Sequence, residues 1–201
     1  MTMQDIHNIF DTPQPQASPQ SGMLLVVEPL LQEAHFHRSV ILLIDHNKEN
    51  GAVGLVLNKR LNVKLHEVMS QATCRREIPL HVGGPVDHTR LLYLHTLGEQ
   101  IRDSVALENG LFLGGNFDDV LRYIDSEEYN ETCIKFFVGY SGWSAGQLEA
   151  EIAEKSWAVA PFDNLPAAML AHDKTYWNEC VETLGDAYRT WLLCPSDSIL
   201  N

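Results

Sequence analysis

One stretch of the sequence constrains the fold more than any other, Gly139-Tyr-Ser-Gly-Trp-Ser-Ala-Gly-Gln-Leu-Glu149. The apolar run Ile134-Lys-Phe-Phe-Val138 precedes it, and Leu148 and Ile152 have the i, i+4 spacing of a buried helix face. These residues predict a strand, a glycine-rich turn and a helix. Glycines in such a turn let the main chain come close to a ligand or to another strand.

The size and composition of the chain are typical of a globular protein with one sizeable core. It has 201 residues, of which 45% are hydrophobic and 20% charged. No apolar run reaches the ~18 residues that a membrane span needs, and the start Met-Thr-Met-Gln lacks the features of a signal peptide. Four cysteines (Cys74, Cys133, Cys180 and Cys194) form no C-x-x-C pair, which favours reduced thiols. We therefore expect a cytoplasmic protein without a membrane segment.

The charge of the chain argues against direct nucleic-acid binding. Its formal net charge is −13, and the acidic residues are spread along the sequence. A uniformly acidic surface repels phosphate backbones. The small basic clusters Lys59-Arg60 and Arg75-Arg76 are interpreted as solvated surface.

The domain organisation is predicted from a change in composition near residue 22. Residues 11–21 are rich in Pro, Gln and Ser, so burial cannot offset the entropy of ordering them. We predict a flexible N-terminal segment at residues 1–21 and a single domain at residues 22–201. Ile6, Ile9 and Phe10 are predicted to form an amphipathic turn that docks on the body or on a second subunit.

The predicted elements favour an α+β fold with a mixed or antiparallel sheet. Apolar runs at residues 23–27 and 38–44 predict strands covered on both faces, and residues 53–57 predict the returning strand of a hairpin. Further strands are predicted at residues 80–82, 91–95, near 105 and at 111–113, and helices at 65–69, 116–124 and 175–193. Strands outnumber helices and are mostly consecutive, unlike a regular βαβ array.

Ser141 and Ser144 each have a catalytic and a structural interpretation. A serine between a strand and a helix resembles a nucleophile elbow, but Trp143 occupies the last glycine position of that motif. A turn role for Ser141 is therefore preferred. Ser144 and Gln147 fit a capping box, in which the serine hydroxyl accepts from the Gln147 amide and the Gln147 side chain reaches back.

The remaining motifs are two glycine pairs and nine histidines. Gly83-Gly84 and Gly114-Gly115 follow predicted strands, yet neither has dinucleotide or P-loop spacing, so tight turns or close backbone packing beside Tyr140 are preferred. No metal-binding spacing of His or Cys is present, although adjacent loops could bring His46, His81 and His95 together. We expect no bound metal and no cofactor.

Seven further segments carry a family resemblance together with residues 139–149. They are Met23-Leu-Leu-Val-Val-Glu-Pro29, Phe36-x-Arg-Ser-Val40, Asp45-His46-Asn47, Gly51-Ala-Val-Gly-Leu-Val-Leu-Asn58, His81-Val-Gly-Gly-Pro-Val86, Leu111-Phe-Leu-Gly-Gly115 and Pro195-Ser-Asp-Ser-Ile-Leu-Asn201. The chain resembles the AlgH/YqgE family of bacterial proteins over residues 22–201, most closely its Bacteroidetes branch. The resemblance implies a bifurcated sheet, partly curled into a small barrel and surrounded by helices. It implies a regulatory role and no agreed catalytic residue.

Three functions remain open. The first is an accessory or regulatory protein that binds an unknown protein or small molecule without chemistry of its own. The second is a hydrolase or small-ligand enzyme with a cleft lined by the glycine turns, and the third is a transcriptional regulator that contacts DNA. The candidate ligand-binding residues are Arg38, His46, Asn58, Gly83, Gly84, Arg90, Gly114, Gly115, Tyr140 and Trp143. No catalytic residue is assigned. Trp143 is predicted to be buried, folded over both glycine pairs.

Overall fold

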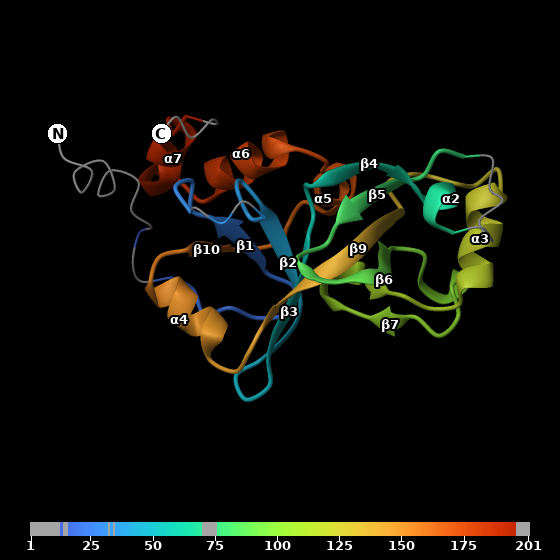
Figure 1. Cartoon of the computed structure of the whole chain (residues 1–201), viewed down its shortest axis with the longest axis horizontal. Helices are drawn as coiled ribbons and strands as arrows, with labels where there is room; N and C mark the ends of the chain where they lie inside the picture. The colour runs from blue at the N-terminus through green and yellow to red at the C-terminus, as the bar shows by residue number, and fades with distance from the viewer. Residues whose placement is uncertain (1–12, 14–15, 32, 34, 70–75, 196–201) are drawn as a thin grey trace.

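The computed structural model describes residues 13, 16–31, 33, 35–69 and 76–195 (Figure 1). The strands are β1 Leu24–Val27, β2 Val40–Asn47, β3 Gly51–Val56, β4 Arg60–Lys64, β5 Pro79–Val82, β6 Val86–His95, β7 Val105–Ala106, β8 Phe112–Leu113, β9 Ile134–Trp143 and β10 Trp157–Ala160. The α-helices are α2 Leu65–Val68, α3 Phe117–Asp125, α4 Gln147–Ala153, α5 Leu165–Leu170, α6 Lys174–Thr183 and α7 Arg189–Leu192. Short 3-10 helices are η1 Gly98–Gln100, η2 Glu108–Gly110 and η3 Asp186–Tyr188.

The strands form one sheet in the order β10-β1-β2-β3-β9-β6-β8-β7, and the β4–β5 pair joins it through β5. The β5–β9 pair is parallel, whereas the other strand pairs are antiparallel. The sheet curls into a half-barrel with helices around it, which confirms the α+β fold expected from the sequence. Figure 1 shows β9 crossing the middle of the molecule, with β1, β2 and β10 on one side and β6 and β7 on the other.

Each half of the sheet has its own apolar cluster. All four residues of β1 are buried, as the apolar run predicts for a strand covered on both faces. Its last carbonyl, that of Val27, accepts a hydrogen bond from the Trp177 indole of α6 at 3.0 Å. In the other half, α3 packs Val120 and Ile124 in a cluster with Phe136 of β9. The hairpin of β2 and β3 and the helices α2 and α3 are confirmed. Among the described helices, none is long and apolar enough to cross a membrane.

The segment predicted as a turn at residues 139–143 is part of a strand. β9 runs through to Trp143, and Gly139 has a φ of 72° where the strand changes neighbours. On one edge, residues 136–138 pair with β5, whereas residues 141–143 pair with β3. One edge of β9 is therefore shared by two strands, and the turn that leads into α4 is confined to residues 144–146.

The sheet forks at Gly83, directly after β5. The amide of Gly83 donates to the carbonyl of Val138 at 2.9 Å, and the carbonyl of Gly83 accepts from the amide of Val56 at 2.8 Å. A Cβ atom at Gly83 would lie 2.1 Å from the carbonyl oxygen of Gly139. Only a residue without a side chain fits between the ends of β3 and β5 and the bend of β9. This result supports the interpretation of Gly83-Gly84 as close backbone packing.

The start of α4 confirms half of the predicted capping box. The Gln147 side-chain oxygen accepts from both the amide and the hydroxyl of Ser144, at 3.0 Å each. The other half was wrong, because the Gln147 amide donates to the Ser144 carbonyl instead of its hydroxyl. Gly146, with a φ of 74°, is the residue that precedes the helix.

The C-terminal helix predicted at residues 175–193 is broken. α6 ends at Thr183, Gly185 adopts a φ of 97°, and η3 and α7 follow. The aromatic residues predicted to lie in the core of this segment are buried there. The rings of Trp177 and Trp191 stack with centroids 6.2 Å apart. β4, β10 and α5 were not predicted.

The described part of the N-terminal segment contacts the body through Gln16. Its side-chain oxygen accepts from the Val159 amide of β10 at 3.0 Å, and its nitrogen donates to the Tyr188 hydroxyl at 2.6 Å. The predicted turn at Ile6, Ile9 and Phe10, like Cys74, lies outside the described residues.

The fork makes a prediction about Gly83. Gly83→Ala forces a Cβ against main-chain atoms, so we expect a loss of about 3 kcal/mol or more in the free energy of unfolding. Gly142→Ala is the control, since its Cβ would lie 3.4 Å from the nearest atom, in the ring of Tyr140. It should change stability by less than about 1 kcal/mol. Urea unfolding of both variants measures the difference, and equal stabilities would contradict the assignment of Gly83 as the fork.

Candidate functional site

The ten candidate positions fall into four separate places. Gly83, Gly84, Arg90 and Tyr140 lie at or near the fork, Arg38 and Asn58 lie together beside α6, His46 and Trp143 are both held by α4, and Gly114 and Gly115 precede α3. Only two of the candidates near the fork, Arg90 and Tyr140, have side chains.

The fork brings Gly84 and Tyr140 into main-chain contact. A Cβ at Gly84 would lie 2.2 Å from the carbonyl carbon of Tyr140. The Gly84 carbonyl also lies 3.1 Å from the His88 Nε2, which donates to it in the matching tautomer. Residues 86–90 of β6 are all exposed, so Arg90 faces solvent beside this junction. The exposed strand segment at residues 86–90 therefore lies next to the close main-chain contact between Gly84 and Tyr140.

Ser141 lies inside the sheet, in an environment that differs from that of a nucleophilic serine. The residue is fully buried in β9, and its hydroxyl donates to the Gly83 carbonyl at 3.3 Å. A nucleophilic serine needs a base within hydrogen-bond reach and an exposed oxygen. Ser141 has a carbonyl partner and no exposure, which agrees with the structural role preferred from the sequence.

Asn58 joins three segments beside α6. Its side-chain oxygen accepts from the Val40 amide at 2.9 Å, and its nitrogen donates to the carbonyls of Arg38 at 2.9 Å and Asp173 at 3.0 Å. Asp173 in turn accepts from the Thr175 amide at the start of α6. Asn58 is 1% exposed, so its polar atoms are committed to the fold.

α4 holds the next group through two glutamates. Glu149 lies 2.9 Å from the Nε2 of His46, and Glu151 accepts from the indole nitrogens of Trp143 and Trp157 at 2.8 Å each. The rings of Trp143 and Trp157 meet edge to face, with centroids 6.0 Å apart. The predicted burial of Trp143 is confirmed, at 7% exposure.

The predicted packing of Trp143 over the glycine pairs was wrong. Its ring lies near Gly54, whose added Cβ would be 3.5 Å from it. The atoms nearest to Gly83 and Gly84 belong instead to Leu55 and to main chain at residues 139–141.

The carbonyls of Gly114 and Gly115 form hydrogen bonds with side chains of β6. The Tyr93 hydroxyl donates to the Gly115 carbonyl at 2.6 Å, and the His95 Nε2 lies 3.0 Å from the Gly114 carbonyl. At the start of α3, Asp119 accepts from the Arg102 side chain at 2.8 and 2.9 Å. These hydrogen bonds hold the pKa of Asp119 well below its usual range. The first turn of α3 is therefore occupied by the chain's own groups, since the Asn116 side chain also accepts from the Asp119 amide.

Lys135 and His81 form a buried basic pair that sequence reasoning missed. The Lys135 ammonium donates to the carbonyls of Ala168 at 3.1 Å, Met169 at 3.2 Å and Ala171, at the end of α5. Burial lowers the pKa of Lys135 to about 7. Burial and then the Lys135 charge lower the pKa of His81 to about 3, so His81 is neutral. The sequence feature that could have indicated a buried lysine was the position of Lys135 within the apolar run of residues 134–138.

His46, His81 and His95 do not come together. Their partners are Glu149, the Phe136 carbonyl and the Gly114 carbonyl. Across residues 13, 16–31, 33, 35–69 and 76–195, no group of three His, Cys, Asp or Glu side chains is placed to hold a metal ion.

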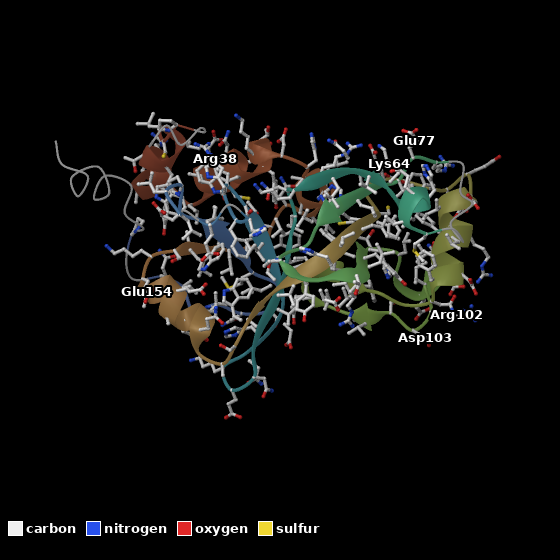
Figure 2. The ribbon with its side chains drawn as sticks, in the orientation of Figure 1. Arg38, Lys64, Glu77, Arg102, Asp103 and Glu154 are labelled. Carbon is white, nitrogen blue, oxygen red and sulfur yellow. The ribbon has the colours of Figure 1, made fainter. Side chains whose placement is uncertain are left out.

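Two depressions on the described part of the surface lie away from the fork. One has a volume of about 190 Å³ and lies between β2 and η2, with Leu43, Ala106 and Leu111 in its lining. The other, of about 490 Å³, is lined by residues of η1 and α3, including Arg102, Asp119 and Arg122. Figure 2 shows Arg102 near α3, in the half of the molecule opposite Arg38.

The fold defines an α+β protein with a forked, half-barrel sheet. A family model described as AlgH-like matches residues 24–189, so the chain belongs to the AlgH-like family. It is 40% identical to a UPF0301 protein of Parabacteroides distasonis, over 99% of this chain and 100% of the relative. It is 37% identical to one of Bacteroides thetaiotaomicron, over 96% and 97%. These relatives confirm the resemblance to the Bacteroidetes branch.

Two solved structures have the same fold. AlgH of Pseudomonas aeruginosa has a TM-score of 0.67 and is 30% identical, over 86% of this chain and 94% of that chain. A Corynebacterium diphtheriae protein has a TM-score of 0.71 over 89% and 94% of the two chains, and at 23% identity this likeness concerns the fold alone.

The α4 group makes a prediction about Trp143. Trp143→Ala removes the contact with Trp157 and one donor to Glu151, so we expect a loss of about 3–5 kcal/mol in the free energy of unfolding. Trp143→Phe keeps an aromatic ring and should cost less, about 1–2 kcal/mol, because it loses the hydrogen bond and part of the indole but keeps a ring against Trp157. Thermal and urea unfolding measure both. A melting temperature of Trp143→Ala close to that of the wild type would instead indicate a role in contacting a ligand.

Proposed function

We propose that this chain is a cytoplasmic accessory or regulatory protein that acts by binding a protein or small-molecule partner, without chemistry of its own. The buried state of Ser141 carries the proposal. Its hydroxyl is the only one placed in a nucleophile-like sequence, and it is fully buried on the Gly83 carbonyl.

Two further buried polar side chains support the same conclusion. Lys135 donates to three carbonyls, and Asn58 uses its oxygen and nitrogen on three main-chain groups. A general acid or base needs a free site within reach of substrate. These groups stabilise the fold instead.

The alternative of a hydrolase with a cleft between the glycine pairs has less support. Gly83 and Gly84 lie against β9, whereas Gly115 lies against the Arg102 carbonyl and Ile101. Neither depression includes Gly83, Gly84, Gly114 or Gly115 in its lining. The polar segment at residues 86–90, which carries Arg90, is the surface that we propose for partner contact, because all five residues are exposed beside the fork.

The proposal predicts that Ser141 is dispensable for chemistry. Ser141→Ala removes one hydrogen bond of 3.3 Å, and the Gly83 carbonyl keeps its bond from Val56, so stability should fall by about 1 kcal/mol or less. A fluorophosphonate probe should label neither the wild type nor the variant, as read by intact mass. Covalent labelling of the wild type that Ser141→Ala abolishes would overturn the proposal.

The proposal also predicts no direct DNA contact. With a net charge of −13, the purified protein should not shift duplex DNA at physiological salt in a gel assay. A regulatory role would then act through a partner. Sub-micromolar, sequence-selective binding of a promoter fragment would favour the transcriptional alternative and contradict ours.

A further inference from the structure

A long bulge interrupts β6 beside the fork. β6 pairs with β9 at Val86 and again from Leu91 onward, whereas β9 has the single residue Gly139 between the two pairing points. Residues 87–90 are therefore extra to the ladder, and all four are exposed. Such extra residues are left unpaired, and the strand that carries them bends. We call residues 87–90 the β6 bulge.

The surface around the β6 bulge has no net charge, although the chain as a whole carries −13. β3 and residues 136–143 of β9 contain no Asp, Glu, Lys or Arg. The bulge itself contains one of each sign, Asp87 and Arg90. Like charges oppose association, so an acidic chain that binds another acidic chain needs a neutral area of this kind.

Apolar and aromatic side chains lie next to the bulge. Val86 is 37% exposed. A Cβ added at Gly142 would lie 3.4 Å from the Tyr140 ring and 4.0 Å from the Val86 side chain, so these two side chains flank an exposed glycine. The Tyr140 hydroxyl has no hydrogen-bond partner among the described residues. Tyrosine and arginine are enriched at the centres of protein interfaces.

The two charges of the bulge are available to a partner. Neither Asp87 nor Arg90 has an ion pair within 4.0 Å among the described residues. Asp87 accepts one hydrogen bond, from the Thr89 hydroxyl at 2.7 Å. A carboxylate has about four acceptor sites, so this bond leaves room for a guanidinium.

The order of residues in this segment is self-complementary. If a second copy lies antiparallel, with the two-fold axis between residues 88 and 89, Asp87 of each copy faces Arg90 of the other. Val86 of each copy then faces Leu91 of the other, which brings apolar side chains together. Two-fold symmetry makes each of these pairs twice. Opposite charges that face each other across antiparallel segments stabilise the contact.

We propose that the β6 bulge is a dimerisation surface, on which a second copy of this chain docks through two Asp87–Arg90 ion pairs. At physiological ionic strength screening acts over about 8 Å, so the distant acidic residues of the two copies repel only weakly while charges in contact attract. The inference rests on the proposed function and deepens it, because it names the partner of the segment at residues 86–90.

Sedimentation equilibrium of the full chain, from low to high micromolar concentration at physiological salt, tests the proposal. The samples are the wild type, Asp87→Arg, Arg90→Asp and an equimolar mixture of these two variants. The controls are Asp186→Arg and Arg189→Asp. They reverse the charges of an exposed pair with the same spacing in sequence, at 3.0 Å, and so match the changes in net charge.

The wild type should approach twice the mass of one chain as its concentration rises. Each reversal in the bulge should raise the dissociation constant about tenfold or more, because two like-charge contacts replace two ion pairs. Each control should change it less than about threefold, since its charges lie outside the contact. The mixture should regain the dimer, because one copy of each variant together restores both ion pairs.

Three results would overturn the dimer: a wild type that stays monomeric, reversals that weaken it no more than the controls do, or a mixture that does not recover. The proposed function would stand in each case, because the segment would then serve a different partner. Covalent labelling of Ser141 would instead overturn the proposed function and leave the dimer untouched.

The φ of 53° at Asp87 calls for a second set of variants. If Asp87→Arg fails to fold, Asp87→Asn replaces it, because asparagine tolerates this conformation. Asp87→Asn, Arg90→Gln and the double variant then form a double-mutant cycle on the dissociation constant. A double variant that loses less affinity than the product of the two single losses would support the ion pair, and strictly multiplicative losses would contradict it.

Discussion

The rest of the structure depends on the contact between Gly83 and the bend of β9. At this point two strands share one edge of β9, and Gly83 holds them with one donated and one accepted main-chain bond. The carbonyl oxygen of Gly139 would be 2.1 Å from a Cβ at Gly83, so no side chain fits. Because β9 belongs to both halves of the sheet, this contact sets how the two apolar clusters are placed.

Buried and half-buried polar side chains bond to main-chain groups and indole nitrogens that strand pairing leaves without a partner. Asn58 bonds to three main-chain groups beside α6, Lys135 donates to three carbonyls at the end of α5, and Glu151 accepts from two indoles. An unsatisfied buried polar group costs about 1–3 kcal/mol, so each of these side chains contributes to stability. Asn58, a candidate ligand-binding residue in the sequence, thus has its side-chain oxygen and nitrogen bonded within the fold. Arg38 is the exception, because its Nε has no acceptor among the described residues.

The sequence predicted the elements that depend on local patterns. The apolar run of β1, the β2–β3 hairpin and the helical spacing in α3 were all recovered. The errors arose where tertiary contacts determine the end of a strand or helix. β9 continues through the glycines because β3 pairs with residues 141–143, and the last helix breaks at Gly185, where φ is 97°.

The candidate positions were chosen individually, and their arrangement could not be predicted. No local pattern reveals that Gly83 and Tyr140 meet while Gly114 lies elsewhere, because strand pairing over long sequence separations decides this. The nearly buried Trp143 was predicted correctly from its small neighbours, but its partners Trp157 and Glu151 were not. Lys135 was overlooked because a single lysine in a strand is usually assigned to the surface.

Native-state hydrogen exchange tests most directly whether β9 makes one cooperative unit of the sheet. The amides of β1 and β2 in one half should be compared with those of β6 and the start of β9 in the other, across increasing urea. The account predicts that the slowest amides of both halves exchange with the same free energy of opening, equal to that of global unfolding. If the slowest amides of one half opened about 2 kcal/mol or more below those of the other, the two halves would unfold separately and the account would be contradicted.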